Sequence, residues 1–317
     1  MFQKTLVASL MFCASVASAY PTGPVTIVVP FPAGQTGDIV ARMVGAELAK
    51  KTGQSFIIDN KPGAGGRSGT AAVAKAKPDG YTLLLTSTGP FAIAPSLYPA
   101  SISYNPIKDF VAVAEVAATP QIIAVSNQSG IQTFADLVKT AQTKDLSYGS
   151  AGNGSTQHLT MELLKLQLKF PMVHVPFKGS AESKTQIMSG LIPATSDSLP
   201  AILPQIKAGQ MKALAVVDHT RSPYLPDVPT LEESGFPKLS TIAFFGVVAP
   251  RGTPQNVVDE LNKQIREILK TPASQQKFKE LALTPPKDFT APQFQEYLTS
   301  EVAKFKKIIT EANVKVE

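Results

Sequence analysis

The sequence predicts an α/β protein made of two units, each a mostly parallel sheet flanked by helices. Short apolar runs rich in β-branched residues alternate along the chain with amphipathic stretches of helical period, which is typical of consecutive βαβ units. About ten strands are expected, and so many strands in 317 residues favour two sheets over one. Because no Gly/Ser-rich linker separates the halves, we expect two lobes joined by crossings of the chain.

The first part of the chain predicts three strands separated by helices. The helix over 38–51 is indicated by apolar residues at spacings of three and four, with Thr36 or Asp38 as its cap. A tight turn at Pro78-Asp79-Gly80 introduces the third strand. The expected order is strand 25–30, helix 38–51, strand 55–59, glycine turn 63–66, helix 68–77 and strand 81–86.

The same alternation continues to the C-terminus. Strands are expected at 122–125, 146–149, 172–175, 193–196 and 212–217, and helices at 133–141, 156–168, 181–189 and 199–208. A longer strand at 241–249 is followed by helices at 254–269, 274–281 and 292–310. Lys and Glu at near i,i+4 spacing indicate that the last helices are solvated and lie outermost.

Residues 1–19 are predicted to be a secretory signal peptide. Lys4 gives the start a positive charge, a largely apolar stretch runs from Leu6 to Val16, and Ala17-Ser18-Ala19 forms a small-x-small cleavage signal. About a dozen apolar residues are too few to span a bilayer. Cleavage would also remove Cys13, the single cysteine, and a chain without thiols suits an oxidising compartment, most simply a bacterial periplasm.

Composition excludes several classes of function. A single cysteine excludes a disulfide scaffold and a zinc ribbon, and the lack of several long apolar runs argues against a polytopic membrane protein. The net charge is +6, but the positive residues are spread in ones and twos without interleaved aromatics. The sequence therefore predicts no nucleic-acid partner.

No catalytic, metal or cofactor motif is found. The histidines, His158, His174 and His219, are not spaced as in HExxH, and neither a GxSxG elbow nor a P-loop occurs. The glycines at 63–69 resemble a dinucleotide fingerprint with its third glycine one place late, so we interpret them as a turn. The strand position of His174 favours a core role, whereas His158 is compatible with core or cleft.

Small polar residues follow several predicted strands at their carboxyl ends. In open α/β sheets, ligands bind at these ends. Two of the loops also open helices, whose first N–H groups and partial positive charge attract an anion, while glycine allows close approach to the backbone. The sequence therefore predicts a carboxylate receptor that uses no arginine. The loops are Phe31-Pro32-Ala33-Gly34-Gln35-Thr36, Ser87-Thr88-Gly89, 150–156 (SAGNGST) and Asp197-Ser198.

The chain resembles the Bug/TctC family, the periplasmic solute-binding receptors of tripartite tricarboxylate transporters, over the whole stretch from Tyr20 to the C-terminus. The motifs that carry the resemblance are VVPFPAGQTGDIVAR, NKPGAGGRSGT, KPDGYTLLLTSTG, SYGSAGNGSTQHL, VHVPFKGS, IKAGQMKALAV, RSPYLPDVPTLEESG and FFGVVAPRGTP. The resemblance implies a two-lobed Venus-flytrap fold. One lobe would combine residues 20–121 with 245–317, and the other would hold 122–244, with a small organic acid enclosed between them.

The resemblance also implies roles for individual residues. The loop of Phe31, Ala33, Gly34, Gln35 and Thr36 would hold one carboxylate through backbone groups and ordered waters. That grip would be completed by Ser87, Thr88, Ser155 and Thr156. Asn153 and Asp197, on the other lobe, would help to set which far group of the ligand fits, and Ser150 and Ser198 are also expected to contact the ligand. Phe245, with Phe31, Phe91 and Phe244, is either a stacking surface for an aromatic acid or part of the core.

Two departures from the family pattern affect specificity. Gln35 stands where a second glycine is usual, and its amide either replaces a bridging water or narrows the cleft. Ser196-Asp197-Ser198 replaces an aromatic-Asp-Asn stretch, and Pro193 precedes it where a polar residue is common. The wall of the second lobe is therefore expected to be roomier than in close relatives.

The expected function is capture of a di- or tricarboxylate or an aromatic acid by a monomeric receptor. The resemblance implies delivery to the permease subunits of a tripartite tricarboxylate transporter, without catalysis. Two alternatives stay open from the residues alone: an exported α/β hydrolase, and a ligand sensor for a membrane signalling partner.

Overall fold

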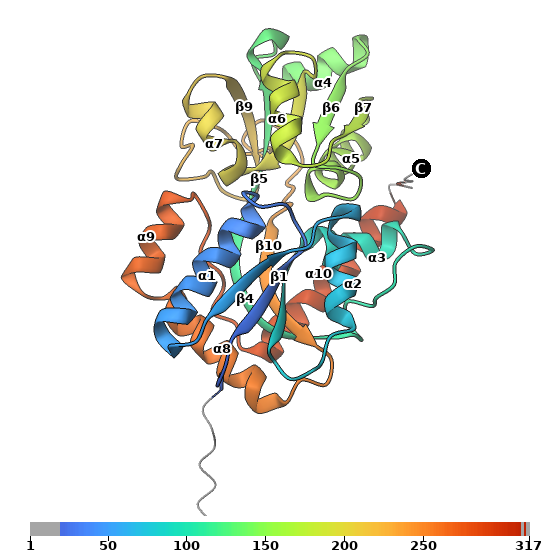
Figure 1. Cartoon of the computed structure of the whole chain (residues 1–317). Helices are drawn as coiled ribbons and strands as arrows, with labels where there is room; N and C mark the ends of the chain where they lie inside the picture. Colours follow the sequence, from blue (N-terminus) through green and yellow to red (C-terminus); the bar gives the residue numbers. More distant parts are fainter. Residues whose placement is uncertain (1–19, 312–313, 315–317) are drawn as a thin grey trace, which may run out of the picture.

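Two five-stranded sheets form the frame of the protein (Figure 1). The computed structural model describes residues 20–311 and Val314, so the predicted signal peptide lies outside the described residues. The first sheet has the order β2-β1-β3-β10-β4, and the second has the order β7-β6-β8-β5-β9. We call each sheet with its helices a lobe, the first lobe and the second lobe. The predicted α/β fold with two sheets flanked by helices is confirmed.

The first sheet combines segments that are far apart in the chain. Its strands are β1 (Val25–Val29), β2 (Phe56–Asn60), β3 (Thr82–Ser87), β4 (Phe110–Thr119) and β10 (Ala243–Pro250). The second sheet is built from β5 (Gln121–Ser126), β6 (Ser147–Ser150), β7 (Val173–Pro176), β8 (Ala194–Ser198) and β9 (Met211–Val217). The chain therefore crosses between the lobes after β4 and again before β10.

Both sheets are mixed, which corrects the expectation of mostly parallel pairing. In the first sheet β1 pairs in parallel with β2 and β3, whereas β10 is antiparallel to β3 and β4. In the second sheet β6 is parallel to β7 and β8, whereas β5 is antiparallel to β8 and β9. The reason is the crossing: β5 and β10 each enter their sheet from the other lobe, so they run against their neighbours.

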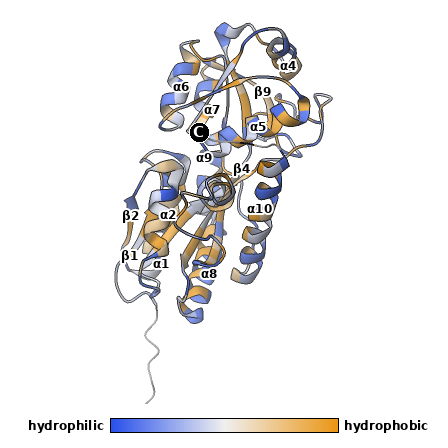
Figure 2. Ribbon diagram, turned by 90° about the vertical axis from the view of Figure 1, so that its right-hand side faces the viewer, coloured by the Kyte–Doolittle hydropathy of each residue, from blue (hydrophilic) through white to orange (hydrophobic). Residues whose placement is uncertain are grey.

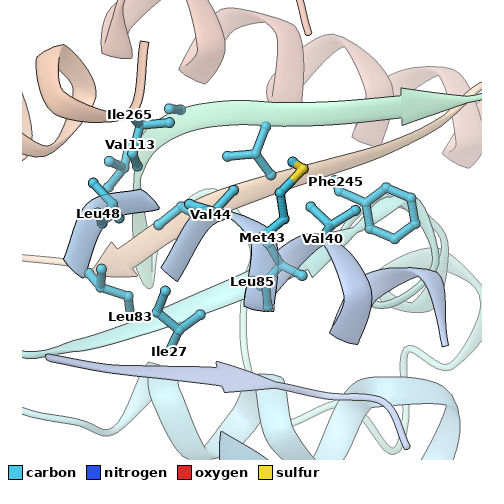
Figure 3. Packing of buried hydrophobic residues seen from close by; sticks show 14 of the residues in the cluster. Ile27, Val40, Met43, Val44, Leu48, Leu83, Leu85, Val113, Phe245 and Ile265 are labelled. Atoms are coloured by element: carbon cyan, nitrogen blue, oxygen red, sulfur yellow. The ribbon is translucent and has the colours of Figure 1, made fainter. Parts of the chain in front are cut away.

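Helices cover both faces of the first sheet. On one face lie α1 (Thr36–Thr52), α8 (Gln255–Leu269) and α9 (Pro272–Glu280), and on the other lie α2 (Arg67–Ala74), α3 (Ala94–Leu97) and α10 (Ala291–Glu311). Figure 3 shows Val40 and Val44 of α1 packed in one cluster with Leu83 and Leu85 of β3. Burial of such side chains contributes about 1.5–3 kcal/mol each, which makes this face a rigid support for the start of α1.

The second sheet is covered in the same way. Helices α4 (Phe134–Thr143) and α5 (Thr156–Leu168) pack on one face, and α6 (Ser180–Met188) and α7 (Leu199–Lys207) pack on the other. Thr133 caps α4 through a capping box with Asp136, which satisfies two backbone N–H groups. The predicted helix 156–168 matches α5 at both ends.

Three local elements were not predicted, and one predicted helix cap was wrong. β4 was not predicted, because its sequence FVAVAEVAAT is rich in alanine and carries a glutamate in the middle. The π-helical turn Gly89–Ile93 and α3 were also not predicted. Neither Thr36 nor Asp38 caps α1: the N-cap is Gln35 without a side-chain bond, and the Asp38 carboxylate instead accepts from the N–H of Gly34 at 2.9 Å.

The outermost helices bury one face and expose the other, as Figure 2 shows for α8 and α10. Val258, Leu261 and Ile265 of α8 are fully buried, while the intervening charged residues face water. Within residues 20–311 and 314, no helix combines the length and the apolar composition that crossing a bilayer requires.

Gly246→Ala is expected to destabilise the first lobe by about 1–3 kcal/mol, the usual cost of overpacking a core. An added Cβ would lie 2.3 Å from Cζ of Phe294 on α10, a ring that is fully buried. Denaturant unfolding measures the loss. Gly23→Ala is the matched control, since no atom lies within 4 Å of its added Cβ. Equal stability of the two variants would contradict the packing assigned to β10.

Candidate functional site

A cavity of about 890 Å³ lies between the lobes. Its walls come from the carboxyl ends of β1, β3 and β8, from the first residues of β5 and β10, and from the loops that open α1, α5, α6 and α7. The volume is within the range of small-molecule sites. Both lobes thus contribute to one enclosure large enough for a small organic molecule.

The cavity brings together most of the residues predicted from sequence. The predicted residues in its lining are Phe31, Ala33, Gly34, Gln35, Thr36, Ser87, Asn153, Ser155, Thr156, Asp197, Ser198 and Phe245. Thr36 of the first lobe and Ser198 of the second lobe also meet directly, with their hydroxyl oxygens 3.2 Å apart. Whether these residues contact a ligand stays a prediction at this point.

Two predicted residues lie outside the lining. The Thr88 hydroxyl oxygen, fully buried, accepts a hydrogen bond from the N–H of Phe244 at 3.0 Å. The Ser150 hydroxyl lies 2.7 Å from Nε2 of His174 and accepts from the N–H of Gly152 at 3.1 Å. Both hydroxyls therefore fix the local backbone, and their predicted contact with a ligand receives no support from the lining of the cavity.

The aromatic residues divide between cavity and core. Phe31 and Phe245 line the cavity, and Phe245 pairs across the sheet with Ser87. Phe91 and Phe244 are fully buried in the core on the α10 side of the first sheet. Phe245 also belongs to the core cluster on the α1 side of that sheet and is only 6% exposed, so it both packs in the core and borders the cavity. Whether Phe31 or Phe245 stacks on a ligand stays a prediction.

The first turns of four helices border the cavity. The N-cap of α1 is Gln35, whose side chain makes no hydrogen bond to the following turn, and the N-cap of α6 is Gly179, which has no side chain to make one. α7 also has no side-chain cap, and it carries Pro200 in its first turn. α5 differs, because Ser155 accepts from the N–H of His158. N–H groups in an uncapped first turn can donate hydrogen bonds to an anion, and α1 and α6 present such groups from opposite lobes.

Asp197 lies at the floor of the cavity and joins three structural elements. Its Oδ1 accepts from Nε2 of Gln157 on α5 at 2.9 Å and from the N–H of Ser198 at 2.7 Å, and its Oδ2 accepts from the hydroxyl of Ser180 at the start of α6. The side chain is 2% exposed, and this burial raises the pKa of the carboxyl above its usual value. Asp197 therefore holds the helix starts together.

The charged residues at the cavity balance one another. Lys178, Glu182, Lys184 and Asp197 are in the lining, and no arginine is among the described residues there. The Nζ of Lys184 donates to the carbonyl oxygen of Ala201 at 2.6 Å. The groups that line the cavity and could attract an anion are therefore these two lysines, backbone N–H groups and hydroxyls, and the receptor without arginine stays a prediction.

Gln35 reaches across the cavity. A Cβ placed on Gly179 of the second lobe would lie 2.5 Å from Nε2 of the Gln35 side chain. Of the two alternatives stated for this residue, the geometry favours the one in which the side chain narrows the cleft.

Sequence reasoning missed several lining residues. The glycine turn at 63–66, interpreted as a simple turn, borders the cavity, and so does the stretch from Phe177 to Ser180, which ends the motif VHVPFKGS. Both follow strands at their carboxyl ends, which was the available signal. Gln121, Pro204 and Gln205 also line the cavity, but they depend on how β5 and α7 pack and had no such signal.

The two-lobed fold and the cavity between the lobes define a solute-binding protein of the periplasmic type. Residues 40–314 match the model of the tripartite tricarboxylate transporter family receptor. The chain belongs to this family, the Bug/TctC receptors, which confirms the resemblance seen in the sequence.

Proteins that are similar to this chain in sequence or in structure support its assignment to the family. Protein BugT of Bordetella pertussis is 32% identical over 304 residues, which cover 95% of this chain and 93% of that protein. The structure of Rhodopseudomonas palustris MatC with bound malate has a TM-score of 0.86 and 31% identity, covering 92% of this chain and 100% of that one. The structure of R. palustris Rpa4515 with adipate has a TM-score of 0.89 and 35% identity, covering 93% of this chain and 99% of that one.

Proposed function

We propose that this protein is a periplasmic receptor that encloses a small organic carboxylate and delivers it to the permease subunits of a tripartite tricarboxylate transporter. The observation that carries the proposal is the pair of uncapped helix starts, α1 in the first lobe and α6 in the second, that border one cavity. A carboxylate oxygen supplies the acceptors that these N–H groups lack.

The same arrangement supplies a mechanism for capture. A ligand held by α1 alone contacts one lobe, whereas a ligand held by α1 and α6 contacts both, so it stabilises the conformation in which the lobes approach. Differential affinity for two conformations is what shifts their populations. Closure then removes water from the hydrogen bonds, which strengthens them. No bond is made or broken, and we propose no catalytic role.

The ligand class follows from the relatives and the shape of the cavity. Adipate is bound in Rpa4515 and malate in MatC, and both are dicarboxylates. We propose a di- or tricarboxylate or an aromatic acid for this chain, with Phe31 and Phe245 beside it. The residues proposed to contact it are the predicted ones that line the cavity.

The remaining features of the proposal concern the whole chain. We propose that residues 1–19 direct export and are removed, and that the mature protein acts as a monomer. The proposed moving units are the predicted ones, 20–121 with 245–317 and 122–244. They agree with crossings of the chain between β4 and β5 and ahead of β10. A sensor for a signalling partner would use the same closure, so deletion of the permease genes followed by uptake assays separates the two roles.

Thermal unfolding with a panel of mono-, di- and tricarboxylates tests the function. A ligand that binds the folded state stabilises it by about 2.7 kcal/mol at one hundred times its Kd, and we expect at least one dicarboxylate to raise the Tm by several degrees. The ligand recovered after denaturation must be chemically unchanged. If no carboxylate shifts the Tm, the proposal is wrong, and turnover of an ester or amide would favour the hydrolase alternative.

A further inference from the structure

Two histidines stack beneath the loop over 150–155, outside the lining of the cavity. The rings of His158 and His174 are parallel to within 8°, with centroids 3.9 Å apart. His158 belongs to the first turn of α5 and is 4% exposed, and His174 lies on β7, the edge strand of the second sheet. Neither takes part in the proposed capture mechanism.

Hydrogen bonds join this histidine pair to the loop. The N–H of Gly154 donates to Nδ1 of His158 at 3.1 Å. The N–H of Gly152 donates to the hydroxyl oxygen of Ser150, which lies 2.7 Å from Nε2 of His174. Both loop glycines are therefore tied, directly or through one hydroxyl, to the two rings.

The loop itself lies between the histidine pair and the ligand cavity. Gly152, Asn153 and Ser155 line the cavity. The opposite lobe also approaches the loop, since a Cβ on Gly154 would lie 2.8 Å from Cε2 of Tyr98. The position of this backbone therefore affects both the ligand contacts and the fit between the lobes.

The direction of the Gly154 bond determines the state of His158. Because an N–H donates to Nδ1, that nitrogen carries no proton, and the neutral ring has its proton on Nε2. Protonation of Nδ1 would place two donors face to face and break the bond. The contact between Ser150 and His174 is different, because a hydroxyl oxygen accepts from a protonated ring as well.

The surroundings favour the neutral state of both rings. Burial, and secondarily Lys165, lowers the pKa of His158 to about 4. Burial, and then His158 itself, lowers the pKa of His174 to about 3. The other ionisable neighbours are Glu162 of α5 and Tyr148 of β6, whose hydroxyl donates to Oε1 of Glu162 at 2.5 Å, and Lys165 pairs with the same oxygen at 2.7 Å. Glu162 is therefore already partnered.

We propose that neutral His158, stacked on His174, is the positioning residue that holds the loop over 150–155 in its ligand-binding geometry. The part of the proposal that concerns affinity rests on the proposed receptor function. The part that concerns the loop does not, because it follows from hydrogen bonds present without a ligand.

Amide hydrogen exchange of the ligand-free protein tests the loop directly. His158→Asn keeps an acceptor, because Oδ1 of asparagine takes the place of Nδ1, whereas His158→Leu removes it. We expect the Gly154 N–H to stay protected in the wild type and in His158→Asn, and to exchange at least about tenfold faster in His158→Leu, the loss of one buried hydrogen bond. His219→Asn is the control, since His219 is exposed and outside the pair.

A pH profile of stability tests whether folding holds His158 in the neutral state that the Gly154 bond requires, and the exchange experiment tests positioning itself. A histidine whose pKa is lowered on folding stabilises the protein above its unfolded pKa of about 6.5, and this contribution is lost as the pH falls towards the folded value. Between pH 7 and pH 5 the unfolding constant of the wild type is expected to rise about 20-fold more than that of His158→Asn. His219→Asn should follow the wild type.

Affinity for adipate, measured by titration calorimetry at pH 7, gives the functional result. We expect His158→Leu to bind about tenfold more weakly, and His158→Asn to stay within about threefold of the wild type. The proposal is overturned if Gly154 stays protected in His158→Leu, or if His158→Asn loses protection as fully as His158→Leu. If His158→Leu does not fold, the exchange and pH profile of His158→Asn decide. Failure of every carboxylate to bind would refute the receptor function and leave the exchange result standing.

Discussion

Gly154→Ala is expected to weaken carboxylate binding at least about tenfold while the protein still folds. The added Cβ would lie 2.8 Å from Cε2 of Tyr98, which belongs to the other lobe. That ring cannot move freely, because the Arg67 guanidinium stacks over it with Cζ 3.7 Å from its centroid. The clash therefore exists only when the lobes approach, and it opposes the conformation that binds the ligand. Titration calorimetry, with a carboxylate that raises the Tm of the wild type, measures the loss.

The matched control is Gly130→Ala in the same lobe. Both glycines have left-handed φ values, 76° at Gly154 and 73° at Gly130, so alanine brings a similar backbone strain of about 1–2 kcal/mol. Nothing lies within 4 Å of a Cβ on Gly130. We expect Gly130→Ala to lower the Tm but to bind normally. In the double variant Gly154→Ala/Tyr98→Ala the loss at Gly154 should largely disappear. Equal affinity of the two alanine variants would contradict the contact between the lobes.

The arrangement of the strands shows how far local sequence determines this fold. Val25–Val29 and Thr82–Ser87 each contain an uninterrupted run of three apolar residues and were predicted as strands, as expected for strands that are largely buried. β4 lies at the edge of its sheet, and its small residues pack under α8 and α10. That environment arises only after the C-terminal helices have folded back, so no local pattern could indicate it.

The residues of the candidate site also differ in how far local sequence predicts them. Loops at strand ends, such as Phe31–Thr36, were predictable because the position of a loop in a parallel unit follows from chain order. The true role of Ser150 was not, because its partner His174 lies on a different strand. The glycine turn at 63–66 was interpreted as a simple turn and was not considered as part of the site, although its position after β2 placed it at the cavity. Chain order predicted where the site is, and tertiary contacts decided which side chains face it.

Asp197→Ala is expected to lower stability by about 3 kcal/mol and to weaken carboxylate binding at least about tenfold. Alanine leaves Nε2 of Gln157 and the N–H of Ser198 without their shared acceptor, and buried unpaired donors cost about 1–3 kcal/mol each. The hydroxyl of Ser180 loses its acceptor as well, so the start of α6 is no longer fixed beside the other two elements. Denaturant unfolding measures the loss of stability, and calorimetry with a carboxylate that raises the Tm of the wild type measures the loss of affinity.

Asp197→Asn distinguishes a structural acceptor from a charged ligand contact. The asparagine Oδ1 still accepts from Gln157 and Ser198, and its Nδ2 donates to the Ser180 hydroxyl, which can turn to accept. If Asp197 acts as an acceptor, this variant should stay within about 1 kcal/mol of the wild type in stability and should bind the same carboxylate as tightly as the wild type. If the charge contacts the ligand, asparagine should cost as much affinity as alanine.

Burial raises the pKa of the Asp197 carboxyl, so the folded protein keeps this carboxyl protonated to a higher pH than the unfolded chain does. Stability is therefore lost as the pH rises from the unfolded pKa through the folded pKa of this group. Because asparagine does not titrate, this loss should be absent from Asp197→Asn.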